Sequence, residues 1–280
     1  MNWWGHQVND FAEEVSRGGR FEFGRNWRAF LATVDEERIA EAGLSLRKML
    51  GVGDLEGRSF LDVGSGSGLF SLAARRLGAR VHSFDYDPQS VACARELKSK
   101  YLPGDQSWTV EQGSALDEKY LESLGEYDIT YSWGVLHHTG DMWKALGNVC
   151  RTVKKDGKLF IAIYNDKGMR SRLWRRIKQA YCSGTAGRLA VCGIFLPYFF
   201  LRTCLACLAA GRNVFADYGR ERGMSVFHDW SDWLGGYPYE YANAEEIVNF
   251  IEQRGYTLTR IKTTEYLGNN QFVFTRKVGK

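Results

Sequence analysis

The stretch from Leu61 to Phe70, which reads LDVGSGSGLF, decides the fold. An apolar run ends in three glycines at alternate positions, and a helix-forming segment begins directly after the third. A strand that turns into a helix through glycines is typical of the first unit of a doubly wound α/β sheet. Glycines in such a turn let the backbone approach a ligand closely. The stretch therefore predicts a fold class and a ligand-binding edge.

The glycine loop lacks the marks of two common nucleotide loops. No lysine follows the glycines, and their spacing is not the G-x-G-x-x-G of dinucleotide folds. Asp62 precedes the loop, where its charge would repel a pyrophosphate and attract a cationic group. Asp85 ends the next predicted strand, where a carboxylate can accept both hydroxyls of a ribose. The pattern favours a cationic group and a ribose.

Outward from the loop, predicted strands alternate with predicted helices between Arg58 and Asn165. The strands are expected at 59–64, 80–85, 107–114, 127–134 and 158–165, and the helices at 69–78, 88–102 and 141–157. This alternation indicates a parallel, doubly wound sheet. The chain closes with a predicted helix and two alternating strands, which indicate an antiparallel hairpin.

With these features the chain resembles the class I S-adenosylmethionine-dependent methyltransferases. The D-x-G-x-G-x-G loop, the acidic end of the second strand and the closing hairpin match that family's pattern. The resemblance covers about Arg58 to Asn165 plus the hairpin. It implies an α/β, doubly wound, mostly parallel seven-stranded sheet with an antiparallel end, and S-adenosylmethionine as methyl donor.

The resemblance also implies which residues bind the cofactor. The loop glycines would pack against its methionine and ribose, Asp85 would bind the ribose diol, and Tyr86 would flank the adenine. Many relatives have an acidic residue after the third strand, whereas this chain has Ser114 and its neighbours, so a hydroxyl or backbone group must bind the adenine amine. Aromatic rings favour a sulfonium, and Trp133, Trp4 and Trp27 can supply them. The expected cofactor residues are Asp62, Gly64, Ser65, Gly66, Gly68, Asp85, Tyr86, Ser114, Ala115 and Trp133.

Two further segments carry the candidate catalytic residues. His137 and His138 follow the fourth strand, where a similar stretch lines the methyl-transfer face in ubiquinone-type O-methyltransferases. Either can be a general base with a pKa near working pH, or can merely cap a helix or bond backbone; we choose His138 as the base. The second segment, 222–240, resembles one in methyltransferases of bacterial polysaccharide and other sugar pathways. Its candidates are His228, Asp229 and Asp232, which would position the acceptor or bind a divalent metal; without a complete ligand set, no metal residue is assigned.

Composition excludes several classes of protein. With 44% hydrophobic and 25% charged residues over 280 positions, the chain is globular rather than disordered or collagen-like. A net charge of +4 is too mild to indicate nucleic-acid binding. Six cysteines without framework spacing, and an N-terminus without a signal-peptide pattern, predict a reduced, cytoplasmic protein.

The segment after Asn165 departs from the α/β rhythm. Basic residues from Arg170 to Lys178 precede a 22-residue apolar run, Leu189 to Ala210. The run is long enough to span a bilayer, but Pro197 interrupts it, and spanning would separate the closing hairpin from its sheet. Four interpretations stay open: a buried helical hairpin, a substrate lid, a dimer contact and a peripheral contact of 170–210 with the inner membrane face.

We expect four parts in the chain. They are an N-terminal helical arm (1–57), whose first 30 residues act as a mobile cover, the S-adenosylmethionine-binding core (58–165), a helical and aromatic insertion (166–240), and the final helix and strand pair (241–280). The expected reaction is methyl transfer to a hydroxyl of a small-molecule or glycan acceptor in bacterial polysaccharide or secondary metabolism. The alternatives are N- or C-methylation, an NAD-dependent oxidoreductase and a non-catalytic binding module.

Overall fold

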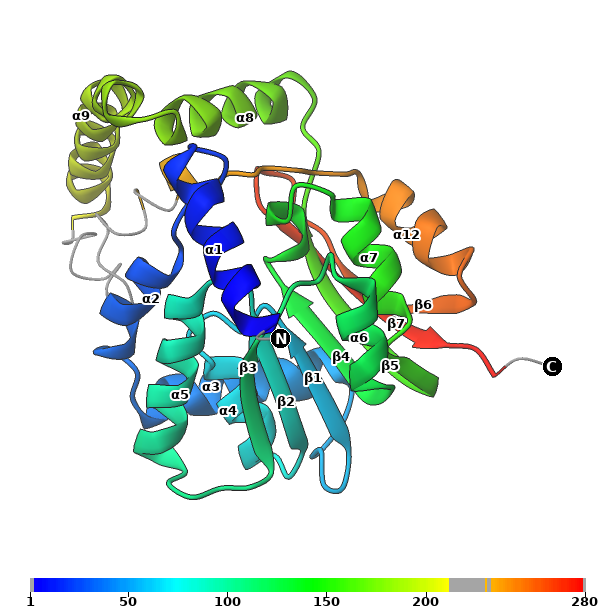
Figure 1. The fold of residues 1–280 in the computed structure, drawn as a ribbon. Helices are drawn as coiled ribbons and strands as arrows, with labels where there is room; N and C mark the ends of the chain where they lie inside the picture. The colour runs from blue at the N-terminus through cyan, green and yellow to red at the C-terminus, as the bar shows by residue number, and fades with distance from the viewer. Residues whose placement is uncertain (1–2, 212–229, 231–232, 279–280) are drawn as a thin grey trace.

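The computed structural model describes residues 3–211, 230 and 233–278, with side chains from residue 10 onward. Its centre is a seven-stranded sheet in the order β3-β2-β1-β4-β5-β7-β6 (Figure 1). The parallel strands are β1 (Ser59–Val63), β2 (Arg80–Asp85), β3 (Trp108–Gln112), β4 (Tyr127–Trp133) and β5 (Val153–Tyr164). β7 (Asn269–Arg276) runs antiparallel to both β5 and β6 (Tyr256–Lys262). The predicted sheet and its antiparallel end are confirmed.

Helices cover both faces of the sheet, and each face has its own apolar core. One face carries α2 (Gly24–Leu31), α3 (Glu36–Leu50), α4 (Leu69–Arg76) and α5 (Pro88–Tyr101). The other carries α6 (Glu118–Leu124), α7 (Met142–Cys150) and α12 (Ala244–Glu252). The central strands are apolar on both sides because both faces are covered, as the buried pattern of β1 shows. Loops at the carboxyl edge are thereby held on a rigid base.

One helix boundary and one additional helix between β3 and β5 differ from the sequence prediction. The helix expected over 141–157 ends at Cys150, because Val153 already pairs with Tyr127 at the start of β5. Strand pairing thus overrides the helix propensity of the lysines that follow. A helix that was not expected, α6, fills the β3–β4 connection, where the Asp117 carboxylate accepts the Tyr120 N–H at its first turn.

Three helices lie beyond the carboxyl ends of the strands. α1 (Trp3–Ser16) crosses this edge, and α8 (Met169–Cys182) and α9 (Thr185–Ala210) form a hairpin that projects from it (Figure 1). α9 continues through Pro197, so the expectation that this proline interrupts the run is wrong. Pro197 cannot donate an N–H to the Gly193 carbonyl, but both residues are exposed, so water can bond that carbonyl instead. A buried helical hairpin is also excluded, because most of α9 is exposed.

Candidate functional site at the carboxyl edge of the sheet

The glycine loop connects β1 to α4 beside the end of β2. The N–H groups of Gly64 and Ser65 both donate to the Phe84 carbonyl, at 2.9 and 3.0 Å. Gly64 has φ 77°, and a Cβ there would lie 2.2 Å from the Val135 side chain. Only glycine fits such a position. The loop is therefore held tightly between β2 and the segment that follows β4.

Gly66 lies at the tip of the loop and meets two other parts of the chain. Its N–H donates to Asp85 Oδ2 at 2.9 Å. A Cβ on Gly66 would lie 2.9 Å from the Trp27 ring of α2. Beside it, the Ser65 hydroxyl is buried and has no hydrogen-bond partner among the described residues. The loop thus combines a close backbone approach with a buried polar atom that lacks a partner.

Two buried carboxylates flank this loop. Burial raises the pKa of Asp62 to about 7, although Ser71 Oγ donates to Asp62 at 2.5 Å. Burial, and then the nearby Asp87, raise the pKa of Asp85 to about 7. Each carboxylate therefore costs free energy to ionise at neutral pH. A bound positive group or hydroxyl donors would lower that cost.

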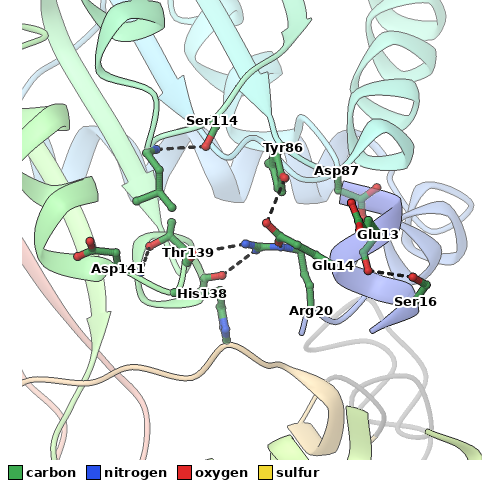
Figure 2. A network of polar contacts seen from close by, with 12 residues as sticks. Glu13, Glu14, Ser16, Arg20, Tyr86, Asp87, Ser114, His138, Thr139 and Asp141 are labelled. Carbon is green, nitrogen blue, oxygen red and sulfur yellow. Dashed lines mark hydrogen bonds and ion pairs between the residues drawn. The ribbon is translucent and has the colours of Figure 1, made fainter. Parts of the chain in front are cut away.

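The other expected cofactor residues lie along the same edge. Ser114 Oγ accepts the Leu116 N–H at 3.2 Å and keeps its own hydrogen to donate (Figure 2). The Ala115 carbonyl accepts a hydrogen bond from the Asn148 amide at 3.0 Å. The Trp133 ring is 41% exposed at the end of β4. Their roles toward a ligand stay predictions.

An arginine of the N-terminal arm joins three parts of the site. Arg20 donates to the carbonyls of His138 at 2.9 Å and Thr139 at 3.2 Å, and it pairs with Glu14 at 2.5 Å (Figure 2). Its guanidinium lies 4.9 Å from the centre of the Tyr86 ring, whose hydroxyl donates to Glu14 at 3.3 Å. The arm is thereby fastened across the ends of β2 and β4.

The same arm covers the ring of Tyr86. The edge of Phe11 meets this ring with 5.5 Å between centroids. Next to Tyr86, the Asp87 carboxylate accepts the Gly24 N–H at 2.7 Å, and this bond holds the start of α2. Sequence reasoning missed Arg20 and Asp87 as site residues. The acidic run at 85–87 was a signal for Asp87, whereas nothing local marks an arginine whose carbonyl acceptors lie more than 100 residues away.

The two histidines after β4 are both buried and hydrogen-bonded to backbone. His138 Nδ1 lies 2.5 Å from the Pro238 carbonyl, which can only accept, so Nδ1 carries the proton and Nε2 the lone pair. His137 Nδ1 accepts the Tyr164 N–H at 3.3 Å. His137 Nε2 is buried without a hydrogen-bond partner among the described residues.

The environment of these histidines corrects the sequence expectation about their charge. Burial, and then the Lys178 ammonium, lower the pKa of His138 to about 3. Burial and then His138 lower the pKa of His137 well below its ordinary value. The expectation of a pKa near working pH is therefore wrong for both. Both rings are neutral at neutral pH, because a charge would be buried among cations.

The insertion returns beneath the histidines and supplies residues that sequence reasoning missed. Lys178 of α8 donates to the Trp233 carbonyl at 2.5 Å and lies 5.1 Å from the centre of the Tyr239 ring. The Glu240 carboxylate accepts the N–H groups of Gly140 at 3.1 Å and Met142 at 3.0 Å. The stretch before α12 is therefore fastened to the loop that carries His138.

The structure does not test three of the predicted site residues. His228, Asp229 and Asp232 lie outside the described residues. In the described part of the chain, no group of three or more His, Cys, Asp or Glu side chains is arranged to hold a metal ion. A cavity of about 520 Å³ lies on the α7 and α12 side; its lining includes Lys144, Arg151 and Arg254 but no expected site residue.

Comparison with known proteins shows what this part of the chain is similar to. Residues 61–161 match the family model described as "Methyltransferase domain". The ubiquinone biosynthesis O-methyltransferase of Xanthomonas oryzae pv. oryzae is 34% identical over 114 residues, which are 40% of this chain and 45% of that protein. The ribosomal protein L11 methyltransferase of Methylococcus capsulatus is 42% identical over 69 residues, 24% of each chain. The chain thus spans less than half the length of these curated relatives.

A solved structure extends the likeness in fold over most of the chain. The magnesium protoporphyrin IX methyltransferase of Synechocystis PCC 6803, with bound SAH, superposes with a TM-score of 0.51. The alignment covers 86% of this chain and 83% of that one at 13% identity. At that identity the likeness concerns the fold alone.

Proposed function

We propose that this chain transfers a methyl group from S-adenosylmethionine to a hydroxyl of a small-molecule or glycan acceptor, since residues 61–161 match the model of a methyltransferase domain. The observation that carries the proposal is the Gly66 tip, where a close backbone approach, the Asp85 carboxylate and the partnerless Ser65 hydroxyl meet. The name of the Xanthomonas relative supports oxygen as the acceptor atom.

The residues at the edge fit S-adenosylmethionine as a ligand. Asp85 accepts one N–H on each oxygen, from Gly66 and Asp87, and each oxygen has a second lone pair for a ribose hydroxyl. The Ser65 hydroxyl can donate to, or accept from, the methionine portion. When bound, the cofactor supplies a methyl carbon whose bond to sulfur breaks as the bond to the acceptor oxygen forms, with the electron pair passing to sulfur. Its positive charge would favour the ionised forms of Asp62 and Asp85.

The chain's own task is to orient the acceptor and take up its proton. His138 Nε2 has a lone pair directed by the Nδ1 bond to Pro238, so it can accept a hydrogen bond from the acceptor hydroxyl. His138 is a weak base, because burial, and then the Lys178 ammonium, lower its pKa to about 3. We assign it orientation of the hydroxyl and partial proton transfer, and His228, Asp229 and Asp232 the binding of the acceptor.

Other reactions are alternatives to O-methylation, some with the same cofactor and one with NAD. N- or C-methylation uses the same cofactor edge, and the fold alone does not choose among them. NAD-dependent oxidation requires a pyrophosphate beside Asp62, which that carboxylate would repel. The pathway, bacterial polysaccharide or secondary metabolism, rests on the resemblance of segment 222–240. The six cysteines lack the spacing of a disulfide framework, which supports a reducing, cytoplasmic location.

Calorimetric titration tests the cofactor assignment. Wild-type protein should bind S-adenosylhomocysteine and not NAD. Gly66→Val should lose this binding, because its Cβ meets Trp27 and fills the space that the ligand needs. Gly53→Val is the matched control, since nothing lies within 4 Å of a Cβ there. Equal binding by both variants would refute the assignment of the loop.

Mass spectrometry tests the acceptor. The protein is incubated with methyl-deuterated S-adenosylmethionine and a bacterial metabolite extract, and products are identified by the mass of the transferred group. Fragmentation that places the label on oxygen supports the proposal. A label on nitrogen or carbon would replace O-methylation by one of the alternatives.

A further inference from the structure

The outer side of α9 exposes more large apolar side chains than a surface helix of a soluble protein usually does. At about 100° per residue, six of its large side chains fall on one broad side. More than half of each is exposed: Leu189, Ile194, Phe200, Leu201, Leu205 and Leu208. Contiguous exposed apolar surface of this kind marks a surface that binds something else. α9 is also long and apolar enough to cross a membrane, by length and composition only.

The opposite side of α9 packs onto the protein. Val191 and Phe199 are buried with Tyr181 of α8 and with Trp230 and Leu234, which come later in the chain. Because these contacts join α9 to segments on both sides of it in sequence, the helix is part of the folded domain. The chain then returns to β7, which pairs with β5, the strand before α8. A helix that crossed a bilayer would have to give up this packing.

The charges around the apolar side are of one sign. Residues 167–215 contain no aspartate or glutamate, although they include nine basic residues: Lys167, Arg170, Arg172, Arg175, Arg176, Lys178, Arg188, Arg202 and Arg212. Four of these arginines, at 170, 172, 175 and 176, are exposed on α8 beside the exposed Met169 and Leu173. Exposed arginines next to an apolar side suit a surface with anionic headgroups over an apolar layer.

We propose that the α8–α9 hairpin docks this protein on an anionic membrane surface, with α9 lying along the surface and its outer side in the headgroup boundary. At 1.5 Å per residue α9 offers about 39 Å of contact. The exposed arginines of α8 then face the headgroups. Because the hairpin projects from the carboxyl edge (Figure 1), docking places that edge toward the membrane. The docking itself does not depend on methyl transfer.

Vesicle sedimentation tests the docking with the full chain. Vesicles of phosphatidylcholine alone are compared with vesicles in which one lipid in four is phosphatidylglycerol, at low and high salt. We expect sedimentation with the anionic vesicles, weakened by salt, and much weaker binding to the neutral ones, since the Debye length shortens as salt rises. Binding of S-adenosylhomocysteine, measured on the same samples, reports separately on the fold and on the proposed function.

Variants separate the two parts of the surface. Leu205→Glu with Leu208→Glu should abolish vesicle binding, whereas Leu44→Glu on α3 should not, although Leu44 and Leu205 are both 57% exposed. Each basic residue lost near an anionic surface weakens binding about fivefold, so Arg172→Gln with Arg176→Gln should lower it about 25-fold. Arg80→Gln, at an exposed position on β2, is the control.

Three results would overturn the proposal. Wild-type protein that stays in the supernatant with both lipids excludes docking. Protein that resists extraction from membranes by alkaline carbonate spans the bilayer instead. A dimer in sedimentation velocity that Leu205→Glu with Leu208→Glu dissociates, without vesicle binding by the wild type, assigns the surface to a second copy of the chain.

Discussion

The carboxyl edge of the sheet and the α8–α9 hairpin meet solvent in opposite ways. At the edge, carboxylates and imidazoles are buried. Burial raises the pKa values of the carboxylates and lowers those of the imidazoles, so the neutral form of each group is favoured. On the hairpin, large apolar side chains are exposed, and only two residues of α9 are buried. Buried titratable groups at the edge indicate a site for a small polar ligand. The exposed apolar surface of the hairpin indicates contact with an extended surface.

The two regions also differ in how their apolar residues are packed. The α/β core buries its apolar residues on both faces of the sheet. The hairpin contributes a small core that consists mainly of Tyr181, Val191, Phe199, Trp230 and Leu234, and leaves its outer side to another surface. Substitutions should therefore act on stability in the core, on turnover and affinity at the edge, and on association in the hairpin.

The largest contrast is expected between two leucines. Leu159 on β5 is fully buried, and Leu159→Ala should lower the free energy of unfolding by about 2–5 kcal/mol, because it leaves a cavity. Leu205 on α9 is 57% exposed, and Leu205→Ala should change it by less than about 0.5 kcal/mol. Denaturant unfolding measures both. Similar losses would mean that α9 is packed as tightly as the sheet.

The next effect concerns turnover at the edge. His138→Ala should lower kcat about 100-fold, the low end for general base catalysis, since a base with a pKa of about 3 gains little. His138→Asn keeps a donor for the Pro238 carbonyl and loses the Nε2 lone pair, so it separates chemistry from folding. Turnover restored by asparagine would make His138 a structural residue. A nearly silent His138→Ala beside an inactive His228→Ala would reverse the assigned roles.

Cofactor affinity should depend on one carboxylate. Asp85→Ala should weaken S-adenosylhomocysteine binding by about 1.5–3 kcal/mol, the size of hydrogen bonds to a charged group. Asp54→Ala, an exposed carboxylate that accepts only a local N–H from Glu56, is the control for calorimetry. An unchanged dissociation constant would limit Asp85 to holding the Gly66 and Asp87 N–H groups.

The pH dependence of that affinity follows from the raised pKa. A ligand that donates to Asp85 prefers the carboxylate, so binding releases a proton below the free-protein pKa of about 7. Affinity should therefore rise about fivefold from pH 6 to pH 7 and only about twofold more above pH 7. Asp85→Asn should flatten the dependence. A persisting slope in that variant would point to Asp62, which has a similar pKa.

The smallest effect concerns the arm. Hydrogen exchange of residues 10–30 should slow when S-adenosylhomocysteine binds, because Arg20 and Trp27 lie across the edge that the ligand is proposed to occupy. Exchange in α3, which packs against α4, is the internal control. Equal protection with and without ligand would make the arm a fixed part of the domain.

Local patterns predicted the repeating part of the fold. Alternating strands and helices, the glycine turn and the closing hairpin follow from periodicity, so the sheet and its antiparallel end were predicted correctly. The start of β5 at Val153 was not, because it depends on pairing with Tyr127 across the sheet. For the same reason the sequence identified His138 as a candidate but not its charge state, which depends on burial and on Lys178 forty residues away.

By itself, the sequence of this protein determined where a ligand loop would lie, since strand, glycines and helix are adjacent in the chain. It also determined that residues 189–210 are apolar, but not which side of them would be covered. The tertiary structure decided that α9 buries one side and exposes the other, and that Arg20 closes the edge 118 residues from its partner. Contacts between distant segments depend on the geometry of the whole fold, which no local spacing encodes.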